Sequence, residues 1–141
     1  MSRLTAVLDA NVLHSYPLTS LLLELAEARL FRPVWSADIH AEWMRSVLAA
    51  AIHAKAQVIV TFNGKDFPEA VLAGYEITAQ HPDTFVRRLV DVAPSIVQVR
   101  IETMLAAWAK PPTDALKFIG FLERCGLPET AAALRKLFAT S

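Results

Sequence analysis

Residues 58–66 read Val58-Ile59-Val60-Thr61-Phe62-Asn63-Gly64-Lys65-Asp66. The first five are apolar or β-branched, and such a short run is typical of a strand covered on both faces, as in a parallel sheet. The next four form a turn signature, because Asn, Gly and Asp all favour turn conformations. We therefore expect a buried strand over residues 58–62 that ends in a polar loop carrying Asp66.

A second, mostly apolar run occupies residues 4–8 and is followed by Asp9 and Asn11. Open α/β sheets bind ligands at the carboxyl ends of their strands, so we expect Asp9 and Asp66 to lie in one cleft. Converging carboxylates repel each other unless a cation neutralises them, and Mg²⁺ binds through a few carboxylates and several waters. The pair therefore indicates a divalent-cation site. The plainer alternative is a capping Asp after one strand and a turn Asp after the other.

Three more polar residues are candidates for the same site. Asn11 and Asn63 follow the two strand ends closely, so either side chain could orient a water or a carboxylate, although both residue types are common in turns. Glu42 lies on the polar face of a helix expected from residue 37 to about residue 55, after a cap at Ser36. A single helical Glu is otherwise a solvated surface residue.

The rest of the chain is mostly helical by its apolar spacing and its proline positions. The order of elements predicts an α/β domain over residues 1–92, with a parallel sheet sandwiched by helices, and a small helical C-terminal domain over residues 93–141. The further expected elements are a helix over 18–30, an extended segment over 31–35, a strand over 74–78, and helices over 82–90, 94–108, 113–124 (capped by Thr113) and 129–138.

Composition limits the partners and the location. The 141 residues carry 14 Lys plus Arg and 14 Asp plus Glu, so a nucleic-acid surface must be a local patch. Small basic groups that could contact RNA are Arg87-Arg88, Arg135-Lys136, and Arg29 with Arg32, although surface solvation is the default reading of each. The single cysteine, Cys125, excludes an internal disulfide and a cysteine-based zinc site. We expect a cytoplasmic protein without membrane spans, because the apolar runs are far shorter than about 20 residues.

Three ordered motifs resemble those of the PIN-domain family. They are residues 8–13 (Leu-Asp-Ala-Asn-Val-Leu), residues 31–36 together with 39–43, and residues 58–68. The tail from about residue 94 to residue 138 resembles the C-terminal domain of one branch of VapC-like toxins.

This resemblance implies a metal-dependent endoribonuclease, the toxin of a toxin–antitoxin system. It implies that Asp9, Glu42 and Asp66 are active-site acids, with Asp9 and Asp66 as ligands of Mg²⁺ (or Mn²⁺). RNA would be the substrate, and a protein antitoxin would be the inhibitory partner.

One departure from the family pattern is informative. The family has a further segment after the helix with the Glu42 motif, and that segment supplies another acid, whereas no Asp or Glu lies between Glu42 and Asp66 here. We therefore expect a segment to be missing near residues 45–47, either as a chain break near Ser46 or as a deletion. A deletion would uncover apolar sheet surface and favour a homodimer.

The same departure keeps two other functions open. The chain could be a catalytically inactive PIN-like binding module that engages an antitoxin or itself. A phosphatase with Asp9 as nucleophile is a weaker alternative, because Asn11 stands where that chemistry usually needs a second Asp as acid.

Overall fold

The computed structural model describes residues 4–35, 43–108 and 113–140, and the chain divides into two compact units. The sheet unit comprises Met1–His14 and Phe31–Pro82, and the helical unit comprises Ser15–Leu30 and Asp83–Ser141. The segment between the first two strands therefore belongs to the helical unit rather than to the sheet unit.

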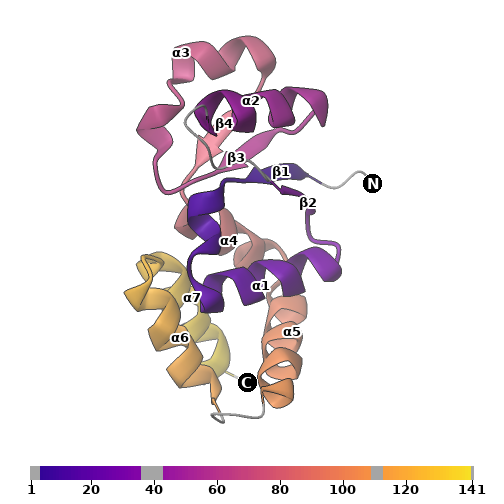
Figure 1. Ribbon diagram of the computed structural model, residues 1–141. Helices are drawn as coiled ribbons and strands as arrows, with labels where there is room; N and C mark the ends of the chain where they lie inside the picture. The colour runs from indigo at the N-terminus through magenta and orange to yellow at the C-terminus, as the bar shows by residue number, and fades with distance from the viewer. Residues whose placement is uncertain (1–3, 36–42, 109–112, 141) are drawn as a thin grey trace. The chain divides into compact units, whose positions relative to one another are not determined.

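Within its described residues, the sheet unit contains a four-stranded parallel sheet in the order β2-β1-β3-β4 (Figure 1). The register pairs Leu8 with both Trp35 and Val60, and Val60 with Gln80. The carboxyl ends of the strands thus finish level at one edge of the sheet. The strands are β1 (Thr5–Leu8), β2 (Arg32–Trp35), β3 (Val58–Val60) and β4 (Thr78–Gln80).

One face of this sheet is covered by α2 (Trp43–His53) and α3 (Glu69–Leu72), which lie on the same side of the strands (Figure 1). Val47 and Ala51 of α2 are buried in one cluster with Val7 of β1 and Ile59 of β3. Every residue of β1 and β3 is buried, as the apolar runs predicted. The unit also contains the short 3-10 helices η1 (Ala10–Leu13), η2 (Gly64–Asp66) and η3 (Ala73–Tyr75).

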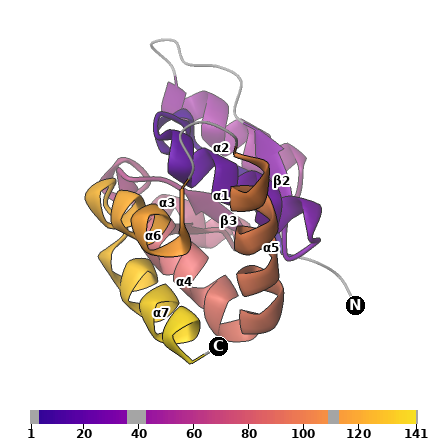
Figure 2. The same cartoon turned by 90° about the horizontal axis from the view of Figure 1, so that it is seen from below.

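The described part of the helical unit consists of five helices, and α6 and α7 lie side by side in both views (Figures 1 and 2). Its core includes four of the leucines of α1 and the fully buried Phe118, Ile119 and Leu134. The helices are α1 (Tyr16–Glu27), α4 (Pro82–Val92, whose first residue belongs to the sheet unit), α5 (Pro94–Ala107), α6 (Ala115–Arg124) and α7 (Pro128–Ala139).

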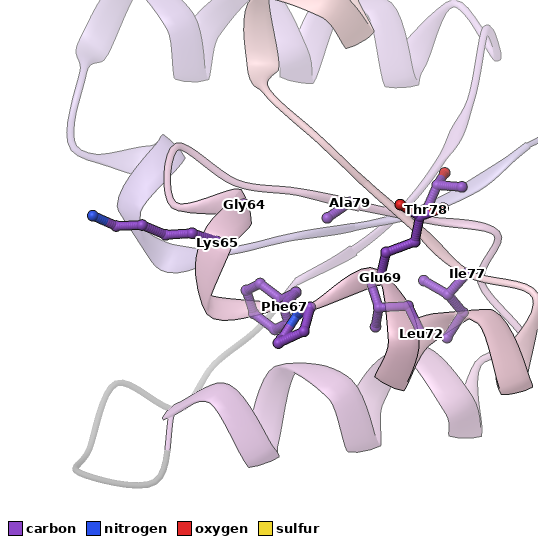
Figure 3. Close-up of a pocket in the computed structure, with 9 residues that line it drawn as sticks. Gly64, Lys65, Phe67, Glu69, Leu72, Ile77, Thr78 and Ala79 are labelled. Atoms are coloured by element: carbon purple, nitrogen blue, oxygen red, sulfur yellow. The ribbon is translucent and has the colours of Figure 1, made fainter.

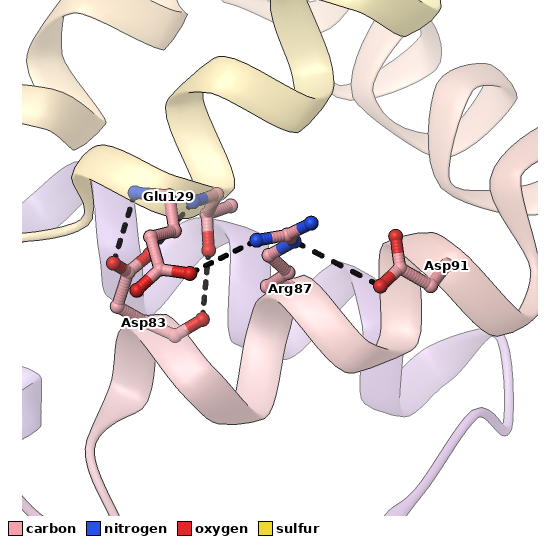
Figure 4. A network of polar contacts seen from close by, with 5 residues as sticks. Asp83, Arg87, Asp91 and Glu129 are labelled. Carbon is pink, nitrogen blue, oxygen red and sulfur yellow. Dashed lines mark hydrogen bonds and ion pairs between the residues drawn. The ribbon is translucent and has the colours of Figure 1, made fainter.

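Asp83 joins the start of α4 to the start of α7 (Figure 4). Its carboxylate accepts hydrogen bonds from the backbone N–H groups of Glu129 (2.9 Å) and Thr130 (2.7 Å). The Thr130 hydroxyl donates in return to the Asp83 carbonyl oxygen at 3.0 Å. The N-cap residue of α7, Leu127, has no side-chain oxygen, so Asp83 supplies the capping oxygens from another helix.

Two helix and strand ends differ from the sequence expectation. The last strand begins at Thr78 rather than at residue 74, because η3 occupies residues 73–75 and Glu76 then adopts a left-handed backbone, with φ of 58°. Asp114 rather than Thr113 caps α6, since its carboxylate accepts the Lys117 N–H at 2.8 Å. The expected Ser36 cap and the first part of its helix lie outside the described residues.

The helix α2 runs from Trp43 to His53 and so includes Ser46, and a segment missing near residues 45–47, as a chain break or as a deletion, stays a prediction. A domain boundary between residues 92 and 93 also stays a prediction. The compact units divide elsewhere, between Pro82 and Asp83 and around the segment Ser15–Leu30. Within the described ranges, no helix is both long and apolar enough to cross a membrane.

Candidate functional site at the carboxyl edge of the sheet

Asp9 follows the last residue of β1 and is 4% exposed. Its backbone N–H donates to the Val60 carbonyl oxygen at 3.0 Å, which ties the start of the loop to the end of β3. A buried carboxylate is costly unless hydrogen bonds or a cation stabilise its charge. The hydrogen bonds of the Asp9 side chain therefore determine how much of its charge the protein itself stabilises.

Thr61 connects the candidate residues. Its fully buried hydroxyl donates to Asp9 Oδ2 at 2.8 Å, and accepts from Asn11 Nδ2 at 3.2 Å and from the Asn63 N–H at 3.0 Å. A hydroxyl has one donor and two acceptor positions, and all three are used here. The two N–H groups can only donate, so the hydroxyl proton is directed at Asp9.

Asn11 has its amide orientation fixed by a second contact. Its Oδ1 accepts from the backbone N–H of Phe62 at 3.3 Å, which places Nδ2 toward Thr61. The expectation that Asn11 supports the Asp9 site therefore has a geometric basis, although its contact reaches Asp9 through Thr61. Asn63 contributes its backbone N–H rather than its side chain.

Thr61 has no role in the site predicted from the sequence. Thr is a common strand former, so the sequence pattern predicts only that Thr61 belongs to a buried strand. The available signal was its position, since it is the one polar residue in the apolar run from residue 58 to residue 62, at the end where ligands bind.

Asp66 closes η2, where its backbone N–H donates to the Asn63 carbonyl oxygen at 3.0 Å. Its side chain is partly exposed. The turn expected after β3 is therefore present, while a shared cleft with Asp9 stays a prediction. Glu42, the third expected acid, lies outside the described residues.

The electrostatic state of Asp9 suits a cation. No ion pair joins Asp9 to a described Lys, Arg or His. Among the described residues, no three His, Cys, Asp or Glu side chains gather into a group that could hold a metal. The Asn11 and Thr61 oxygens are already engaged in hydrogen bonds, so the Asp9 carboxylate is the described group at this edge that could bind a cation. A carboxylate oxygen suits a hard divalent cation better than a thiolate-binding metal.

Two of the candidate basic groups are engaged in ion pairs inside the helical unit. Arg87 pairs with Glu129 at 2.9 Å, and Arg135 pairs with Glu123. The hydrogen bond from Arg135 holds the pKa of Glu123 below its usual value. These arginines therefore have carboxylate partners within their own unit, which makes them weaker candidates for phosphate contacts.

Comparison with known proteins identifies the family. Residues 82–136, which run from α4 into α7, match the family described as the VapC50 C-terminal domain. The chain is also 38% identical over 94 residues to the Mycobacterium tuberculosis protein named "Putative ribonuclease VapC50". This chain belongs to the VapC-like PIN-domain family. Both the resemblance and the expected fold class, a PIN-like parallel sheet with a helical C-terminal part, are confirmed.

The match to this VapC-like relative includes 67% of the present chain and 55% of the relative. The chain therefore spans about half the length of the protein it matches. No solved structure matched the chain.

Proposed function

We propose that this VapC-like chain is a metal-dependent endoribonuclease, the toxin of a toxin–antitoxin system that acts in the cytoplasm. The observation that carries the proposal is the buried Asp9 carboxylate at the carboxyl edge of the sheet, oriented by Thr61 and without a cationic partner among the described residues. The printed name of the M. tuberculosis relative supports the choice of RNA as substrate.

Asp9 and Asp66 would hold Mg²⁺ (or Mn²⁺) through their carboxylate oxygens, and Glu42 would complete the acidic site. When bound, such a cation lowers the pKa of a water and stabilises negative charge on the phosphate. Charge stabilisation at the phosphate is the largest requirement of the reaction, so the two Asp residues carry most of the expected effect.

Thr61 acts as a positioning residue in this scheme. Its hydrogen bond restrains Asp9 Oδ2, and the contacts of Asn11 and Asn63 restrain Thr61 in turn. Partners that orient a ligand residue commonly change metal affinity or activity by about 10- to 100-fold when removed. Thr61, Asn11 and Asn63 thus form one hydrogen-bonded support for the Asp9 carboxylate.

The test is cleavage of a mixed-sequence RNA by the purified full chain. We expect cleavage with Mg²⁺ or Mn²⁺, none with a chelator, and a large loss in Asp66→Asn, because an amide is a poorer ligand for a hard cation. Asp91→Asn is the matched control, since Asp91 is an exposed residue of the helical unit. Undiminished cleavage by Asp66→Asn, or cleavage that persists in chelator, would overturn the mechanism.

A second candidate function is an inactive PIN-like module that binds an antitoxin or another copy of itself. It is favoured by the sequence, which has no Asp or Glu between Glu42 and Asp66, where the family pattern has another acid. A chain that binds its antitoxin but cleaves no RNA at any Mg²⁺ or Mn²⁺ concentration would support this alternative.

We further propose a protein antitoxin as the inhibitory partner and a homodimer as the free state. Light scattering on the purified chain measures the mass of the free state directly. A monomer at all accessible concentrations would exclude the homodimer, and unchanged RNA cleavage in the presence of bound antitoxin would exclude inhibition by that partner.

A further inference from the structure

A cavity of about 460 Å³ opens in the sheet unit beside η2, α3 and β4 (Figure 3). Its volume lies within the range of about 300–1,000 Å³ that is usual for small-molecule sites. The apolar part is formed by the buried Phe67, Leu72 and Ile77. The full lining is Gly64, Lys65, Phe67, Pro68, Glu69, Leu72, Ile77, Thr78 and Ala79.

The cavity adjoins the proposed catalytic edge. Asp66 stands between the lining residues Lys65 and Phe67, so the wall of the cavity and the proposed metal ligand share one short loop. Thr78 is two residues before the carboxyl end of β4, which is roughly 7 Å at about 3.3 Å per residue. A group bound in the cavity therefore contacts residues that lie within a few positions of the carboxyl edge of the sheet.

The polar groups of the cavity come from two elements. Figure 3 shows the Glu69 side chain extending from α3 toward Thr78 of β4, whereas the Lys65 side chain extends away from the other lining residues. Glu69 and Thr78 are both exposed, so the carboxylate lies at the open side of the cavity, and the Lys65 ammonium group points away from the cavity.

Ala79 adds a backbone donor and acceptor. The backbone N–H of Thr78 donates to the Gln57 carbonyl oxygen at 3.0 Å, and the Gln80 carbonyl oxygen accepts from the backbone N–H of Thr61 at 2.9 Å. In a parallel ladder, alternate residues bond to the same neighbouring strand, so Ala79 directs its N–H and C=O away from β3. Since β4 is an edge of the described sheet, these groups point to its open edge, and Ala79 is also one of the residues that line the cavity.

We propose that this cavity binds an unpaired guanine base of the RNA, an inference that rests on the proposed ribonuclease function. Proteins read unpaired bases through apolar contact with the ring and hydrogen bonds to its Watson–Crick edge. Guanine has two adjacent donors on that edge, N1–H and the N2 amino group, which match a carboxylate such as Glu69 in the bidentate manner of Arg.

The other three bases fit this carboxylate less well. Adenine and cytosine place a ring acceptor beside their amino group, and uracil places an acceptor on each side of its single N–H. Each of them would bring a lone pair against the Glu69 carboxylate. The outward Ala79 N–H supplies a donor for the guanine O6, and Lys65 supplies a positive charge for a neighbouring phosphate.

The first test is titration of the full chain with GMP, AMP, CMP and UMP in chelator, followed by calorimetry. We expect GMP to bind at least about 10-fold more tightly than the others, because one well-placed bidentate contact discriminates between bases by that order. Glu69→Gln should remove the preference, and Glu76→Gln, an exposed Glu outside the cavity lining, should keep it. Equal affinity for the four nucleotides would overturn the proposal.

The second test fills the cavity. Thr78→Trp should abolish GMP binding, whereas Val71→Trp, at an exposed position of α3 outside the lining, should not. Circular dichroism establishes that both variants are folded. GMP binding by a folded Thr78→Trp variant that equals the wild type would contradict a site in this cavity.

A third readout separates this proposal from the ribonuclease function. Asp66→Asn should lose RNA cleavage and keep the GMP preference. In wild-type cleavage products, cut sites should lie beside G, and Glu69→Gln should cut without that bias. Cleavage that shows no bias in the wild type removes the guanine site and leaves the nuclease intact, whereas GMP preference without any cleavage removes the nuclease.

Discussion

Asp9 and Asp83 are both buried, 4% and 6% exposed, and yet their surroundings differ in kind. The Asp83 carboxylate accepts hydrogen bonds from two backbone N–H groups at the start of α7, where the helix dipole also favours negative charge. The Asp9 carboxylate accepts a hydrogen bond from one hydroxyl group among the described residues, that of Thr61. The two carboxylates are thus similarly buried, and the donors around them are what distinguishes them.

Asp9 and Asp83 also differ in the charge of the side chains that lie near their carboxylates. Beside Asp83 lies Arg87, which pairs with Glu129 and, at 3.8 Å, with Asp91. Around Asp9 the neighbours are neutral groups of Asn11 and Thr61, which restrain the carboxylate without neutralising it. The carboxylates near Asp83 thus have an arginine partner within their own unit, whereas Asp9 has no ion-pair partner among the described residues.

The largest effect that this comparison predicts is on catalysis. Asp9→Asn should lower metal-dependent RNA cleavage by at least about 100-fold, because the charge that holds the cation is lost. The fold should survive, since the amide still accepts from Thr61. Cleavage rates at saturating Mg²⁺ measure the effect, and comparable loss in the isosteric Asp83→Asn would show that the two aspartates do not differ as argued.

The next effect is on stability. Asp83→Ala should lower the free energy of unfolding by about 2–3 kcal/mol, because two N–H groups at the start of α7 lose their acceptors and Thr130 is buried. Urea denaturation followed by circular dichroism measures this. Asp91→Ala is the exposed control and should change the value by less than about 0.5 kcal/mol. Equal losses of unfolding free energy in the two variants would show that Asp83 does not cap α7.

A smaller effect is expected at Thr61. Thr61→Val preserves the shape of the side chain but removes the hydroxyl, so cleavage should fall about 10-fold and the Mg²⁺ concentration for half-maximal rate should rise. Thr61→Ser retains the hydroxyl and should restore most of both. An unchanged Mg²⁺ requirement in a folded Thr61→Val variant would reduce Thr61 to a packing residue.

The smallest effect concerns the exposed pair of Glu123 and Arg135. The hydrogen bond from Arg135 lowers the pKa of Glu123 below its ordinary value of 4.5 in the folded chain. Its stabilisation is therefore present above pH 4.5 and disappears as the pH falls through the folded-state pKa. Thermal denaturation of wild type and Glu123→Gln should differ slightly at pH 7 and converge near pH 3. A difference that grows toward low pH would contradict the assignment.

The sequence predicted the parts of this comparison that depend on local pattern. The buried strands β1 and β3 follow from their apolar runs, and the positions of Asp9 and Asp66 follow from those strands. The role of Thr61 could not be predicted in the same way, because its contact with Asp9 joins residues 52 positions apart. The role of Asp83 could not be predicted either. An acid after Pro82 is expected to stabilise the start of its own helix, whereas the Asp83 carboxylate caps α7.

The first residue of β4 could not be predicted from the sequence for a different reason. Residues 74–78 contain β-favouring side chains, but the left-handed backbone at Glu76 delays the strand to Thr78. Backbone conformations of this kind are uncommon outside glycine and carry little sequence signal. The guanine-binding cavity depends on this placement, and no pattern in the sequence indicated it.

The early position of α1 in the chain has a consequence for synthesis on the ribosome. Leu18, Leu21, Leu22 and Leu25 of α1 are fully buried, and α1 packs within its unit against α5 and α6. One such contact, from Glu27 to Arg100, spans 73 residues. The helix therefore emerges long before the helices that cover it, and its leucine face stays exposed during that interval. Nascent chains that stall before residue 100 should accordingly bind chaperones or aggregate through α1.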